Sequence, residues 1–149
     1  MTITSSTFIS DSVLFIRNLL RTNLTDPISR GSGNIHYIFT SFPKDNTQYP
    51  LVVVKNTSIN TNKLGISSEV SWVNAKYEIK VYSLNSKEVD NITQQIIDLL
   101  RTNQFGTGGT SEEQLFGFRL ESVVPLVDAQ AEQPVHMKTL TFVYNNILT

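Results

Sequence analysis

Residues 77–100 read YEIKVYSLNSKEVDNITQQIIDLL, and two periodicities meet within this one stretch. Apolar and polar residues alternate over its first five positions, which is typical of a strand with one buried face. After Asn85 or Ser86, either of which can cap a helix, apolar residues recur three and four positions apart. The stretch therefore predicts a strand that leads directly into an amphipathic helix lying across one face of a sheet.

The rest of the chain predicts one more helix and four more strands around this pair. The helix is expected over about residues 11–23, and the strands over residues 35–40, 51–54, 116–124 and 135–144. The order helix, strands, helix, strands predicts an α+β fold with two helices packed on a mixed, mainly antiparallel sheet. A length of 149 residues corresponds to one domain, residues 1–149.

Two segments carry specific expectations about their place in the sheet. Residues 51–54 form a short β-branched run of the kind that is buried on both faces in a central strand. Residues 56–62 are almost wholly Asn, Thr and Ser, so we expect an exposed loop or hairpin tip there.

The alternation between residues 66 and 84 changes parity. Ile66, Val70 and Trp72 share one parity, whereas the apolar residues from Val73 onward share the other. Because side chains of a strand alternate between its faces, this change requires a bulge, a bend or a strand end. A local bulge and a strand end that covers a neighbouring subunit both fit the pattern, and Trp72, the only tryptophan, is either a core residue or a contact hot spot. The candidate contact residues are Ile66, Val70 and Trp72, with Lys63, Arg119 and Glu121 as polar contacts.

The sequence contains no recognisable catalytic or metal-binding motif. His36 and His136 are the only histidines, and neither stands in a nucleophile–base–acid pattern or at metal-ligand spacing. The glycines of residues 106–109 lack the lysine of a phosphate-binding loop and lead into acidic residues. There is no cysteine, which excludes thiolate nucleophiles and thiolate metal sites. We therefore expect no catalytic residue, no metal and no cofactor, in a protein that is not an enzyme.

Charge and hydropathy also exclude several classes of partner. The chain has 12 Lys and Arg against 13 Asp and Glu, and a net charge of -1 provides no field that would gather nucleic acid or anionic lipid. No run of about 18 apolar residues exists, and residues 1–12 lack the basic cluster of a secretory signal. We expect a soluble protein that binds neither membrane nor DNA by charge, so binding or assembly remains as its role.

Six segments along nearly the whole chain share an element order and a loose apolar pattern with one known family. They are residues 49–54, 72, 76–83, 87–89, 116–120 and 136–142. In this order they resemble the tail-terminator, or tail-completion, proteins of long-tailed bacteriophages. The Asn-rich residues 56–62 and the Gly-rich residues 104–114 depart from the family's pattern.

This resemblance implies a structural virion protein assembled in the host cytoplasm. It implies a hexameric ring that caps the head-proximal end of the tail tube, stops tube polymerisation and joins the tail to the neck. The implied partners are further copies of the chain, the major tail tube protein and the neck connector, with DNA passing through the ring without sequence-specific binding. The alternatives are a neck or head-closure subunit and, from another class, a small ligand-binding module.

Overall fold

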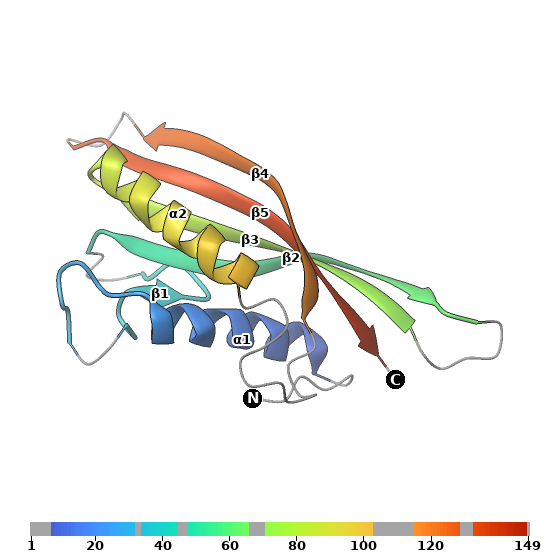
Figure 1. Ribbon diagram of the computed structural model, residues 1–149. Helices are drawn as coiled ribbons and strands as arrows, with labels where there is room; N and C mark the ends of the chain where they lie inside the picture. The colour runs from blue at the N-terminus through green and yellow to red at the C-terminus, as the bar shows by residue number, and fades with distance from the viewer. Residues whose placement is uncertain are drawn as a thin grey trace.

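The computed structural model describes residues 7–31, 34–44, 48–65, 71–102, 115–128 and 133–148. Its elements follow the order α1 (Phe8–Asn23), β1 (Ile38–Phe39), β2 (Leu51–Lys63), β3 (Ser71–Ser83), α2 (Ser86–Thr102), β4 (Phe116–Asp128) and β5 (Val135–Leu148), as Figure 1 shows. The predicted α+β class, with two helices and a helix–strands–helix–strands order, is confirmed.

The five strands form one mixed, mainly antiparallel sheet in the order β1-β2-β3-β5-β4. The short β1 runs parallel to β2, and each of the other neighbouring pairs is antiparallel. The strand predicted over residues 35–40 shrinks to two residues because the backbone N–H groups of Tyr37 and Ile38 both bond to the carbonyl of Asn34. The Asn34 side chain in turn donates to the carbonyls of Arg21 and Leu24, which fixes this turn against the end of α1.

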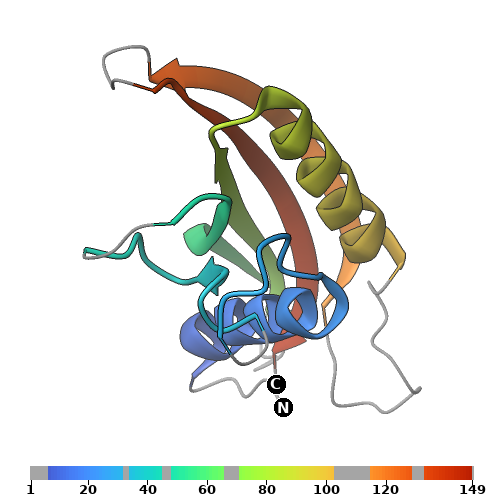
Figure 2. The same cartoon turned by 90° about the vertical axis from the view of Figure 1, so that its left-hand side faces the viewer.

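Both helices pack on the same face of the sheet (Figure 1). α2 lies over β3, β5 and β4, and α1 lies over β1 and β2. Asn85 caps α2 as predicted, since its Oδ1 accepts bonds from the backbone N–H groups of Lys87 and Glu88. In Figure 2 the loop between α1 and β1 lies beside the C-terminal end of α1, so the segment from α1 to β1 is held against this layer.

The core between the helices and the sheet is centred on aromatic rings. The odd-numbered residues of β3 from 73 to 81 are fully buried beneath the helices. Phe142 of β5 lies 5.7 Å, between ring centroids, from each of Tyr77, Phe118 and Tyr144. The Tyr144 hydroxyl donates a hydrogen bond of 2.8 Å to the carbonyl of Leu100, which ties β5 to the last turns of α2.

β2 is longer than the sequence suggested. Residues 51–54 are buried and pair with β3, and Val52 and Val53 also pair with β1, as expected of a central strand. The expectation of a loop or hairpin tip at residues 56–62 is wrong, because these residues continue β2 and pair with β3, although most of their side chains are exposed. A bulge at Thr57 is held by the side chains of Asn56 and Thr57, which both donate to the carbonyl of Lys76. Figure 1 shows this half of the β2–β3 pair reaching beyond both helices.

The parity change near Trp72 coincides with the start of a strand. β3 begins at Ser71 and keeps continuous register with β5 through Ser83, so the interpretation of a bulge within β3 is wrong. The irregularity in this region belongs to β2, between Asn56 and Ser58. Ile66 and Val70, which carried the other parity, lie outside the described residues.

The side chain of Asn146 is buried on the helix-covered face of the sheet. Asn146 of β5 is 0% exposed, and neither its amide nitrogen nor its amide oxygen has a hydrogen-bond partner among the described residues. A buried amide that lacks its hydrogen bonds costs about 1–3 kcal/mol.

Replacement of Asn146 by Leu is therefore expected to raise the free energy of unfolding by about 1 kcal/mol, because the desolvation cost disappears at similar side-chain volume. Urea unfolding followed by circular dichroism measures the change. Asn60→Leu, at an exposed position of β2, is the matched control and should stay within about 0.5 kcal/mol of the unmodified protein. A clear loss of stability in Asn146→Leu would contradict the prediction.

Candidate functional site

The side of the sheet opposite the helices is covered by no helix in the described part of the chain, and we call it the open face. Alternate residues of each long strand point to it. In β3 these are the even-numbered residues from 72 to 82, all of them partly exposed. The open face therefore offers a broad surface whose composition changes along the strands.

A charged cluster occupies the middle of the open face. Lys76 Nζ lies 2.9 Å from Glu121 Oε2, and Arg119 Nη2 lies 3.4 Å from Glu121 Oε1. The hydrogen bond from Lys76, supported by the positive charges of Lys76 and Arg119, lowers the pKa of the Glu121 carboxyl. Glu121 reaches this position at an irregularity in the β4 register, between Leu120 and Ser122. The predicted polar contacts Arg119 and Glu121 are thus brought together.

This cluster borders a shallow polar hollow of about 240 Å³ that spans four strands, β2, β3, β5 and β4. Its lining residues are Ser58, Asn60, Asn74, Lys76, Arg119, Glu121 and Val143. A second group of charges lies further along the same face, where Glu78 pairs with Lys55 at 3.6 Å and with Lys80 at 3.3 Å. Alternating charges of this kind suit contact with another polar surface better than the capture of a small ligand.

Trp72 lies on the open face near the start of β3. Its ring packs edge-on against Phe116, with centroids 5.4 Å apart, and its Nε1 donates to Asn74 Oδ1 at 3.2 Å. Its side chain is half-buried, and it points away from the helix-covered core that Val73 enters. Lys63 pairs with Ser71, the residue directly before Trp72 in β3. Because adjacent residues of a strand point to opposite faces, the exposed side chain of Lys63 lies on the face opposite Trp72. The structure therefore groups Trp72 with Arg119 and Glu121 but not with Lys63.

The other end of the open face is apolar, and sequence reasoning missed it. Phe42 packs edge-on against Tyr82 at 5.2 Å, and this pair lines a hollow of about 280 Å³ together with Leu126 and Met137. Burial raises the pKa of the Tyr82 hydroxyl. Leu126 and its neighbour on the same face, Val124, are 57% and 51% exposed. A signal was present in the unbroken apolar run of residues 123–127, which is unusual for a strand at a sheet edge.

The described residues show no arrangement for metal binding. They contain no cluster of His, Asp or Glu that could hold a metal ion. His36 precedes β1 and His136 lies in β5, three positions away in the sheet, so the two histidines do not meet. The hollow beside Arg30, about 400 Å³, contains a guanidinium already engaged by Asp26 and by the carbonyls of Gln48 and Pro50.

Comparison with known proteins adds no assignment. No protein-family model matches the chain, and no curated protein is detectably similar to it in sequence. No helix among the described residues has the length and apolar character needed to span a membrane.

Proposed function

We propose that this protein is a tail terminator of a long-tailed virus, a structural subunit that forms a ring on the head-proximal end of the tail tube. The observation that carries the proposal is the open face, which has a charged centre, exposed apolar side chains at one end and the partly exposed Trp72–Phe116 pair at the other. A solvated antiparallel face normally carries polar side chains, and contiguous exposed apolar groups mark contact sites. The resemblance over six segments selects the tail terminator among assembly proteins.

In this proposal each subunit uses separate surfaces for separate partners. The sides of the sheet meet neighbouring copies, while the ends of the ring meet the last ring of tube protein and the neck connector. One half of the β2–β3 pair extends past the helices, namely residues 55–63 with their partners in β3. In the proposal this projecting half contacts a partner protein. A net charge of -1 leaves DNA free to pass. The proposal assigns no catalytic residue and no cofactor.

The proposal is tested by the mass of the purified protein in solution, alone and mixed with tail tubes, using light scattering and negative-stain imaging. A terminator gives a ring with a mass near six chains and decorates tube ends. DNA-filled heads without tails serve as the second target, because a head-closure subunit binds them in preference to tubes. A strict monomer that ignores tubes would contradict the proposal.

Replacement of Trp72 by Ala is expected to weaken the ring while the monomer stays folded. Removing a buried aromatic contact residue costs 2 kcal/mol or more of association energy, which raises the concentration at which rings dissociate by about 30-fold. Within the monomer the change removes one edge-on contact with Phe116, worth about 0.5–1.5 kcal/mol. Light-scattering mass as a function of concentration measures the change in ring association, and thermal unfolding measures the change in monomer stability. An unchanged ring, or an unfolded monomer, would refute the contact role.

A further inference from the structure

We propose that neighbouring subunits join edge to edge, with the outer edge of β4 of one copy lying antiparallel to β1 and the adjoining part of β2 of the next. This contact rests on the proposed ring, for which it names one surface between copies, separate from the contact assigned to Trp72 on the open face. The occupant of the β4 edge is thus a second copy of this chain.

The first observation is the apolar character of the β4 edge. Val124, Leu126 and Val127 are each more than half exposed, and they lie on both faces of the strand, since adjacent residues alternate. A run that is apolar on both faces is typical of a strand with neighbours on every side. Within the described residues no strand pairs with the outer edge of β4. Pro125 removes one backbone donor there, so side-chain burial supplies most of the contact.

The second observation is a receptive surface on the opposite edge of the sheet, where β1 covers β2 over only two residues. Beside it lies the hollow of about 400 Å³, whose apolar lining includes Phe39, Pro43 and Leu51. Ile28 and Ile35, in the loop that precedes β1, are about half exposed. Figure 1 shows β1 and β4 on opposite sides of the sheet. Each copy therefore carries one apolar edge and, at the opposite edge, one hollow whose lining is part apolar and part polar.

The register places these two surfaces at the same level along the strands. One unbroken row of paired residues crosses all five strands and consists of Phe39, Val53, Lys80, Thr139 and Val124. Two residues further along the strands, toward the apolar end, the next row on the open face consists of Leu51, Tyr82, Met137 and Leu126. A second copy that continues the sheet in the same orientation brings Val124 beside Phe39 and Leu126 toward the hollow beside Leu51.

The strand directions also suit this contact. β1 and β2 run the same way, β3 reverses, β5 reverses again and β4 runs opposite to β1. The junction between copies is therefore antiparallel, which continues the pattern of the long strands. Because the two edges differ, the contact is heterologous and repeats from copy to copy, and such a repeat forms a ring when its rotation closes.

The absence of cysteine allows a cross-linking test without background thiols. Val124→Cys combined with Phe39→Cys places one thiol on β4 and one on β1, at the two positions that the continued row brings side by side. Within one chain the two edges stand four strand spacings apart, roughly 19 Å, which exceeds the roughly 7 Å that a disulfide bridges. Any disulfide must therefore join two chains.

Oxidation of the double variant is expected to give a ladder of cross-linked multiples on a non-reducing gel, ending at the closed ring. Each single variant should remain uncross-linked, since a heterologous contact keeps like residues apart. Val124→Cys with Thr61→Cys is the matched control, because Thr61 lies on the same edge at the level of Val73 and should give no ladder. Dimers from Val124→Cys alone, or rings whose double variant forms no disulfide, would overturn the contact.

A second variant separates this contact from the proposed function. Leu126→Lys is expected to shift the light-scattering mass from ring to folded monomer, whereas Leu64→Lys, at an almost equally exposed leucine, keeps the ring. If Leu126→Lys keeps the ring and only loses tube ends, the β4 edge binds the tube protein; the contact between copies is then overturned while the terminator proposal stands. A monomeric unmodified protein overturns both.

Discussion

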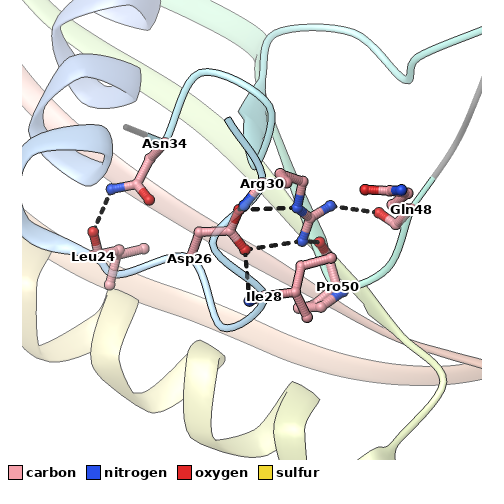
Figure 3. Close-up of polar contacts among 7 residues, drawn as sticks. All are labelled: Leu24, Asp26, Ile28, Arg30, Asn34, Gln48 and Pro50. Carbon is pink, nitrogen blue, oxygen red and sulfur yellow. Dashed lines mark hydrogen bonds and ion pairs between the residues drawn. The ribbon is translucent and has the colours of Figure 1, made fainter. Parts of the chain in front are cut away.

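Replacement of Arg30 by Met lowers the free energy of unfolding by about 3–5 kcal/mol, because it leaves a buried charge without its partner. Arg30 Nε lies 2.9 Å from Asp26 Oδ2, and the two side chains are only 10% and 4% exposed. The same guanidinium donates to the carbonyls of Gln48, at 2.7 Å, and Pro50 (Figure 3). It also lies over the ring of Tyr37. Arg30 thus joins the loop after α1 to the entry into β2.

Urea unfolding measures this loss. Arg101→Met, in the exposed last turn of α2, removes the same charge and is expected to change stability by no more than about 0.5 kcal/mol. Arg30→Lys keeps the charge but loses the forked geometry, so an intermediate loss is expected. A loss below about 1 kcal/mol for Arg30→Met would show that the loop rearranges to solvate Asp26.

The same pair makes stability depend on pH. Burial by itself would raise the pKa of Asp26, but hydrogen bonds from the Arg30 side chain and from the backbone N–H groups of Arg30 and Ile28 outweigh it and hold the pKa below its ordinary value. A depressed pKa contributes stability above the ordinary carboxyl range and loses it as pH falls through the folded pKa. The stability gap between the unmodified protein and Asp26→Asn should therefore narrow between about pH 5 and pH 2.

Replacement of Phe142 by Ala is expected to lower the free energy of unfolding by about 3–5 kcal/mol, because it leaves a cavity in the core. Phe142 is 0% exposed and contacts three other aromatic rings, so little solvent or loop can move in to fill the space. Near-ultraviolet circular dichroism should lose intensity as the remaining rings gain freedom, and urea unfolding gives the energy.

Phe42 provides the matched control, because it makes one aromatic contact and is 44% exposed. Phe42→Ala is expected to cost about 1 kcal/mol or less. Equal losses of unfolding free energy in the two variants would mean that the aromatic core collapses around the smaller side chain at position 142, and would contradict the prediction of a cavity at this site.

The strand–helix pair β3–α2 could be predicted because its signals are local. The alternation of β3 and the spacing of apolar residues after Asn85 each follow from the chain's own periodicity. The second half of β2 could not, since its Asn, Ser and Thr residues favour turns in isolation. It forms a strand because β3 supplies a hydrogen-bonding partner, which is a contact between residues distant in sequence.

The candidate surface, like the fold, could be predicted from the sequence only in part. Trp72, Arg119 and Glu121 stand out by residue type, and the structure places them on one face. Their proximity depends on β5 lying between β3 and β4, which the chain order does not reveal. The apolar edge at Val124 and Leu126 was missed because an apolar run in a sequence normally indicates burial.

The strict alternation of β3 has a consequence for how such a protein changes over time. Odd positions from 73 to 81 lie under the helices, and even positions such as Lys76, Glu78 and Lys80 lie on the open face. Substitutions at the even positions can alter the charge of the open face while the folding free energy stays nearly constant. A lineage can thus acquire a differently charged open face through single steps that each leave a folded protein.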